Sequence, residues 1–309
     1  MNTADEIIKT IEANQDKIAF VIGNGVNRYF GSGVLLSWEG LLKQVWMMNS
    51  SCGKAFSSVP SGISNTEFID ALEIELIRNR VDFNKRNEVD FNKIKKDIAS
   101  IVGDWQPISG ISTMVQKIES KQTPLLTTNF DLLFEFAFGM SERKLPLKGK
   151  RSTDFYPWNY YYGKKGMKLL SGPNNGFGIW HVHGMATHPR SIRIGLNDYM
   201  GLVERGRGII QKNYLGNGFI PTNTWLDIVF SKSLFVFGLG LETDEVFLRW
   251  LLLQRAKYNE IHKVGLKGWY VTCIKYESIS PGKRLFLESI GFEIIEVATA
   301  NIVYEDIWG

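Results

Sequence analysis

The segment at residues 124–131 reads Pro-Leu-Leu-Thr-Thr-Asn-Phe-Asp and joins two apolar runs. The first run, at 124–126, has the length of a strand, and the second, at 132–138, has the density of a buried helix start. Asn129 and Asp131 can cap that helix. They can also project an amide and a carboxylate into the crevice at the carboxyl end of a parallel sheet, where ligands of such folds bind. The segment predicts a strand, a turn and a helix, with both uses of its polar residues left open.

A second strand and turn lie near the start of the chain. Residues 18–22 (Ile-Ala-Phe-Val-Ile) predict a buried strand that leads into Gly23-Asn24-Gly25-Val26-Asn27. Two glycines one residue apart allow a tight turn and let backbone amides approach a phosphate. The dinucleotide fingerprint would place a third glycine where Arg28 stands, so a simple strand-ending turn is an equally good interpretation.

The last third of the chain has the clearest alternation of strands and helices. Strands are expected at 233–237, 269–274 and 292–295, with helices at 243–256 and 283–290 between them. The first of these strands leads into a further glycine turn, Gly238-Leu239-Gly240. This order predicts an α/β fold with a Rossmann-like parallel sheet, covered by helices on both faces.

The middle of the chain departs from that alternation in two places. Helices expected at 66–80 and 90–103 make residues 50–104 a helical insertion, which divides the α/β domain into residues 1–49 and 105–309. Residues 141–178 are first basic, then aromatic, then glycine-rich, and predict an irregular cap over a pocket. Basic residues beside aromatic ones can also bind single-stranded nucleic acid, which is the alternative for this segment.

Composition limits the classes of function. The net charge of +4 suits a small anionic ligand and is too weak to indicate nucleic acid. Two cysteines, Cys52 and Cys273, cannot form a four-ligand zinc site, so no zinc ribbon is expected. The N-terminus has no apolar signal core and no apolar run reaches membrane-spanning length. We therefore expect a cytoplasmic protein.

Two histidines fall in a predicted strand at 178–184, Gly-Ile-Trp-His-Val-His-Gly. His181 and His183 are expected to share a face, because side chains alternate along a strand. No carboxylate or thiol follows at a metal-ligand spacing, so no metal site is expected. His181 should lie deeper and be hydrogen-bonded, whereas His183, before Gly184 at the strand end, should be free to reach a ligand.

Four motifs in this order resemble the sirtuin family over about residues 18–256: Gly-Asn-Gly-Val-Asn, Thr-Thr-Asn-Phe-Asp, His-Gly and Phe-Val-Phe-Gly-Leu-Gly-Leu. The resemblance is closest to the sirtuin-like NAD hydrolases of bacterial antiviral defence. The segment Ser-Trp-Glu-Gly-Leu-Leu at 37–42 also resembles this branch. It implies hydrolysis of NAD to nicotinamide and ADP-ribose, without a metal, by an abortive-infection effector that depletes cellular NAD. It also implies control by a homo-oligomer or by a separately encoded partner, such as an ATPase or a nuclease.

The resemblance assigns roles to residues. His183 would be the general base, Asn129 would orient the nicotinamide ribose or the attacking water, and Asp131 would bind the carboxamide. The backbone amides of the 23–25 turn would hold the pyrophosphate, and the 238–240 turn would lie against the adenosine half. The implied NAD-binding residues are Gly23, Asn24, Gly25, Asn27, Thr128, Phe130, Gly238 and Gly240.

The departures from the family pattern concern the acyl-peptide side of the site. The paired Cys-x-x-Cys motifs of deacylating sirtuins are absent, and Arg-Ile-Gly-Leu-Asn at 193–197 stands where they have Phe-Gly-Glu. This favours hydrolysis over deacylation. The alternatives are an NAD-dependent protein deacylase or ADP-ribosyltransferase, or a regulatory module that binds NAD or a nucleotide without turnover. A pure binding module would not need a base such as His183.

Overall fold

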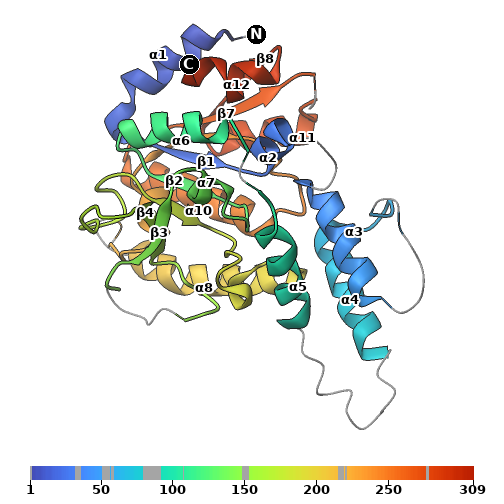
Figure 1. Cartoon of the computed structure of the whole chain (residues 1–309). Helices are drawn as coiled ribbons and strands as arrows, with labels where there is room; N and C mark the ends of the chain where they lie inside the picture. Colours follow the sequence, from blue (N-terminus) through green and yellow to red (C-terminus); the bar gives the residue numbers. More distant parts are fainter. Residues whose placement is uncertain are drawn as a thin grey trace.

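The computed structural model describes residues 2–31, 36–50, 56, 59–78, 92–106, 108–147, 153–214, 219, 221–275 and 278–309. These residues form an α/β fold around one eight-stranded sheet with the strand order β3-β4-β5-β2-β1-β6-β7-β8 (Figure 1). The strands from β5 to β8 in this order pair in parallel. The predicted parallel sheet with helices on both faces is therefore confirmed.

The sheet places the carboxyl ends of its central strands side by side. β1 pairs with β2 on one side and with β6 on the other, with Ile22 opposite both Thr127 and Phe237. The three turns that the sequence singled out after these strands therefore meet at one edge. The strands are β1 Ile18–Ile22, β2 Leu125–Thr127, β3 Met140–Lys144, β4 Tyr160–Lys164, β5 Ile179–His181, β6 Ser233–Phe237, β7 Gly268–Cys273 and β8 Phe292–Val297.

Alternation along the strands divides the core between the two faces of the sheet. Ala19 and Val21 of β1 belong to one buried cluster, whereas Ile18, Phe20 and Ile22 belong to the other. The first cluster is covered by α8 Leu196–Tyr214, α9 Trp225–Val229, α10 Val246–His262 and α11 Pro281–Ser289. The second is covered by α1 Ala4–Ala13, α2 Gly25–Phe30, α6 Ile111–Ser120, α7 Leu133–Ala137 and α12 Ala300–Tyr304.

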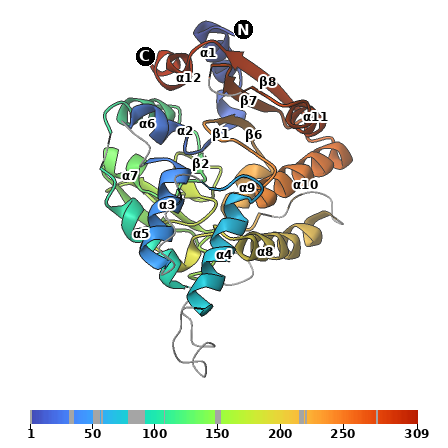
Figure 2. The same cartoon turned by 90° about the vertical axis from the view of Figure 1, so that its right-hand side faces the viewer.

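A third buried cluster joins the helices α3 Trp38–Asn49, α4 Asn65–Arg78 and α5 Asn92–Gly103, which stand together beside the sheet (Figure 2). Phe130 and Ile192 of the α/β part also pack in this cluster, so the three helices rest against the turn after β2. The helices expected at 66–80 and 90–103 are confirmed as α4 and α5. The domain division at 50–104 stays a prediction, and much of the linker that precedes α4 lies outside the described residues.

The expectation that residues 141–178 form an irregular cap is wrong for two parts of this segment, which form the strands β3 and β4. β3 and β4 pair antiparallel along their full length, and β4 also joins the sheet beside β5. The aromatic residues alternate across this edge: Tyr161 is buried in the first cluster and Tyr162 in the second. Tyrosine is favoured in half-buried strands, and here it extends the sheet core instead of forming a loop.

Among the residues that the structure describes, no helix combines the length and the apolarity that a membrane crossing requires.

Candidate active site

The glycine turns after β1 and β6 pack directly against each other. The Gly23 amide donates to the Phe237 carbonyl at 3.2 Å, and the Gly25 amide donates to the Gly238 carbonyl at 2.8 Å. A Cβ at Gly23 would lie 2.5 Å from the Gly238 oxygen, and one at Gly25 would lie 2.6 Å from the Gly238 Cα. The two glycines of the first turn are therefore required by this close backbone contact.

The amides of Gly23 and Gly25 were expected to hold a pyrophosphate, which stays a prediction, but neither amide is without an acceptor here. Both amides already donate hydrogen bonds to carbonyls at the end of β6 and in the turn after it. Adjacent parallel strands bring these segments close enough to pair their backbone groups. Gly238 has a φ of +64°, which favours glycine, whereas a Cβ at Gly240 would meet nothing closer than 3.6 Å. The adenosine contacts of Gly238 and Gly240 stay a prediction.

A chain of buried amide and carboxyl groups connects the turn after β1 with the turn after β2. The Asn27 side-chain amide donates to Asp131 Oδ2 at 2.8 Å and to Asn24 Oδ1 at 2.9 Å. Asp131 Oδ1 also accepts from the Leu133 amide at 3.1 Å, so Asp131 supports the start of α7 as well as the site. Burial raises the pKa of Asp131 to about 6, against the opposing effect of the Leu133 amide.

Asn129 has a fixed backbone and a free side chain. Its amide donates to Thr127 Oγ1 at 3.1 Å, and its carbonyl accepts from His181 Nδ1 at 2.7 Å. Thr127 in turn donates its hydroxyl proton to the Ile22 carbonyl at 3.0 Å. The Asn129 side chain is only 4% exposed, and neither its oxygen nor its nitrogen has a hydrogen-bond partner among the described residues. Such a buried, unpaired amide is unusual and indicates a place for a polar ligand.

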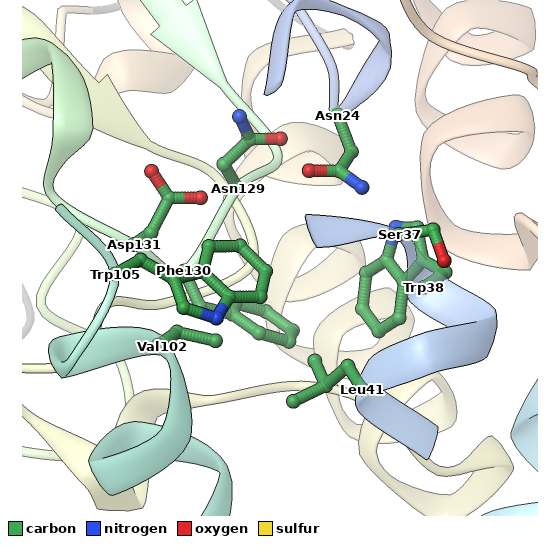
Figure 3. Close-up of a pocket in the computed structure, with 9 residues that line it drawn as sticks. All are labelled: Asn24, Ser37, Trp38, Leu41, Val102, Trp105, Asn129, Phe130 and Asp131. Atoms are coloured by element: carbon green, nitrogen blue, oxygen red, sulfur yellow. The ribbon is translucent and has the colours of Figure 1, made fainter. Parts of the chain in front are cut away.

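Asn129 lines a cavity between the turns after β1 and β2 and the helices α3 and α5 (Figure 3). The space is about 250 Å³, part of it open to solvent. Figure 3 shows amide and carboxyl groups on one side and aromatic and aliphatic side chains on the other. Trp38 packs edge-to-face against Phe130 with ring centroids 5.2 Å apart. The lining residues are Asn24, Ser37, Trp38, Leu41, Val102, Trp105, Asn129, Phe130 and Asp131.

Of the aromatic wall of this cavity, sequence reasoning singled out Phe130 but missed the two tryptophans. Val102 belongs to α5, in the segment interpreted as an insertion, and Trp105 is the first residue after that segment. Helical periodicity marks Trp38 and Leu41 as the inner side of α3 but cannot say that this side faces a ligand cavity. Thr128, expected to bind NAD, is buried and is not among the residues that line the cavity, and its amide donates to the Ile22 carbonyl at 3.3 Å.

His181 is packed and hydrogen-bonded, as expected. Its Nδ1 lies 2.7 Å from the Asn129 carbonyl and its Nε2 lies 3.0 Å from Glu135 Oε1, with both side chains buried. Burial by itself lowers the pKa of His181, but the adjacent Glu135 carboxyl outweighs it, and the net shift is upward. His181 therefore anchors the backbone that presents the Asn129 amide.

The expectation that His183 lies on the same face as His181, at the open end of the strand, is wrong. β5 ends at His181, so strict alternation does not extend to residue 183. His181 contacts the Tyr162 ring on one side of the sheet, whereas His183 packs against Phe247 of α10 on the other. The His183 side chain is 0% exposed and is not among the residues that line the cavity.

His183 has an acidic neighbour that the sequence did not indicate. Its Nε2 lies 3.2 Å from Glu245 Oε1, without the alignment of a hydrogen bond. Burial lowers the pKa of His183 to about 3. Burial, with help from Asp244, raises the pKa of Glu245 to about 8. Near neutral pH the imidazole is uncharged and able to accept a proton, and the carboxyl group retains one.

Within the described ranges, no three His, Cys, Asp or Glu side chains gather closely enough to hold a metal ion. Cys52 lies outside those ranges, and Cys273 carries a free thiol.

Comparison with known families places these features in one context. A family model described as SIR2-like domain matches residues 123–294, which is more than half of the 309-residue chain. Comparison with curated proteins finds no match. The matched region contains the turn after β2, both histidines and the 238–240 turn, and it begins after the turn at 23–27. The chain therefore belongs to the SIR2-like domain family, and its activity is NAD-related.

Proposed function

We propose that the protein is an NAD hydrolase, which cleaves NAD to nicotinamide and ADP-ribose. The observation that carries the proposal is the unpaired, buried Asn129 amide in a cavity with aromatic walls. A flat ring with a carboxamide matches this cavity, because its amide can pair with Asn129 while its faces pack against Trp38 and Phe130. Asp131 and Asn24 supply further polar contacts on the same side.

The cavity lies beside the carboxyl ends of β1 and β2, where it would take the nicotinamide end of NAD. The remainder of NAD would lie along the carboxyl edge of the sheet, where Asn27 and Asn24 connect the turn at 23–27 to Asp131. In this assignment Asn24, Asn27, Thr128 and Phe130 shape the site together with Gly238 and Gly240.

The chemistry requires few groups. The bond between ribose C1′ and the nicotinamide nitrogen breaks through an oxocarbenium-like state, and the electron pair neutralises the pyridinium ring. Water adds its oxygen to C1′ and loses a proton to a base. A neutral imidazole can accept that proton. Burial keeps His183 neutral but also weakens it as a base, so the Glu245 carboxyl beside it would have to be ionised to stabilise the imidazolium. Asn129 holds the reacting group in place, which lowers the entropic part of the barrier.

Incubation of the purified protein with NAD, with and without an acetylated peptide, tests the proposal. We expect nicotinamide and ADP-ribose in equal amounts without the peptide. Asn129→Ala should lower kcat/KM by at least about tenfold to a hundredfold, since it removes a positioning amide. Asn301→Ala, at an exposed position of α12, is the matched control and should match the wild type. Turnover only with the peptide would identify a deacylase, and NAD binding without turnover would identify a regulatory module.

We further propose that this activity serves bacterial antiviral defence by abortive infection, through depletion of cellular NAD. An unregulated hydrolase of this kind would harm its own cell, so a homo-oligomer or a separately encoded partner, such as an ATPase or a nuclease, would control it. Phage challenge of cells that carry the wild type or Asn129→Ala, with NAD measured over time, tests the role. Full activity of a dilute monomer with nothing added would refute regulation by an oligomer or a partner.

A further inference from the structure

A compact group of polar side chains surrounds His183 between the sheet and the helices α8 and α10. The His183 and Tyr199 ring centroids are 5.2 Å apart, and the Tyr199 hydroxyl lies close enough to the Glu245 carboxyl to favour its ionised form. Glu245 is the N-cap residue of α10, and its Oε1 lies 3.2 Å from His183 Nε2. Phe247 closes the group with its ring centroid 6.2 Å from that of His183.

The polar atoms of His183 and Glu245 lie close together but do not form a hydrogen bond. Both ring nitrogens of His183 and Oε1 of Glu245 are buried without a hydrogen-bond partner among the described residues. Leaving such buried atoms unpaired is costly, so a hydrogen-bond partner is expected when a substrate is bound. The distance between Nε2 and Oε1 already suits a hydrogen bond, and only the alignment is missing.

We propose that Glu245 is a positioning residue for His183: its carboxylate accepts a hydrogen bond from Nε2–H and thereby leaves the Nδ1 lone pair as the base. The inference rests on the proposed hydrolysis of NAD. As water bonds to C1′ and the bond to nicotinamide breaks, the water proton moves to Nδ1. The imidazolium that forms is stabilised by the Glu245 carboxylate, and the proton then passes to solvent.

The arrangement makes the reaction depend on the protonation of Glu245. Burial and the neighbouring Asp244 raise the pKa of this carboxyl to about 8, and the Tyr199 hydroxyl acts in the opposite direction. Below about pH 8 the carboxyl keeps its proton and is not the carboxylate that would accept a hydrogen bond from Nε2–H. The active form therefore accumulates as the pH rises through about 8. The charged and titratable groups around the pair are Tyr199 and Asp198 on α8, Asp244 before α10, and Arg193 and Lys95, which bind Asp198.

The pH dependence of kcat/KM for NAD separates this role from a structural one. The wild type should rise through about pH 8. Glu245→Gln should lose this rise and fall at least about tenfold below the wild type at high pH. Glu245→Asp should restore part of the rise. Tyr199→Phe should move it to higher pH, because the lost hydroxyl no longer stabilises the carboxylate. Glu260→Gln, an exposed site on the same helix, is the control and should match the wild type.

Nuclear magnetic resonance of the His183 ring nitrogens gives a second readout that needs no turnover. The Nε2–H tautomer should become dominant through about pH 8 in the wild type but not in Glu245→Gln. If that titration occurs and NAD is not cleaved, the proposed function fails and the His183–Glu245 pair stands. An unchanged pH profile in Glu245→Gln, or an identical His183 titration in both proteins, would overturn the pair.

Discussion

Replacing His181 with alanine should destabilise the protein strongly, because the side chain joins two buried groups. It bridges the Asn129 carbonyl and the Glu135 carboxyl, and the side chains of His181 and Glu135 are 0% and 1% exposed. The variant leaves a carbonyl and a carboxyl group without their partner, and Glu135 Oε2 already has none among the described residues. Removing one member of a buried pair typically costs about 3–5 kcal/mol. We expect His181→Ala to lower the free energy of unfolding by about that amount.

The chain contains a matched control for this experiment. His188 and Glu142 form a similar pair at 2.7 Å, but their side chains are 25% and 32% exposed. Exposed pairs contribute about 0–1 kcal/mol, so His188→Ala should have little effect. Urea unfolding of both variants measures the difference. Equal losses for His181→Ala and His188→Ala would refute the argument that burial makes the His181 pair important.

The pair also predicts a pH dependence and a coupling. The pKa of His181 is raised in the folded state, so its charge-dependent contribution to stability is complete below about pH 6.5, its ordinary value, and is lost as the pH rises through the folded value. Combining His181→Ala with Glu135→Ala should cost less than the sum of the two single losses, by about 0.5–3 kcal/mol. Strict additivity would show that the two side chains do not interact.

Four further predictions test the site and the fold. His183→Ala should lower NAD turnover by at least about a hundredfold, as expected for a lost general base, and His183→Gln, which preserves the volume, should be equally inactive if the loss is chemical. Gly25→Ala should lower stability by about 1–3 kcal/mol, because its Cβ meets backbone, whereas Gly240→Ala, whose Cβ would meet nothing closer than 3.6 Å, should unfold like the wild type. Trp105→Ala should raise KM for NAD severalfold with a smaller change in kcat, since it removes a wall of the cavity. Prolonged dialysis against EDTA should leave turnover unchanged, and loss of activity restored by zinc would show that a metal site was missed.

The sequence alone determined the α/β class and the positions of the central strands. The alternation of short branched runs, glycine turns and amphipathic helices is local information, and β1, β2 and β6 lie where it placed them. Asn129 and Asp131 could also be singled out, because polar residues after a buried strand have a restricted set of uses. Of the two expected uses, support of α7 is confirmed for Asp131, which accepts from the Leu133 amide, and contact with a ligand stays a prediction.

Tertiary structure alone decided which groups face each other. The end of β5 at His181 places the two histidines on opposite faces of the sheet, and strand periodicity could not reveal where the strand would stop. Glu135 lies 46 residues before its partner His181 in the chain, and Glu245 lies 62 residues after its partner His183. Long-range packing of α3 and α5 likewise formed the aromatic wall of the cavity. Local propensity determines elements, but side-chain contacts between distant elements depend on the geometry of the whole fold.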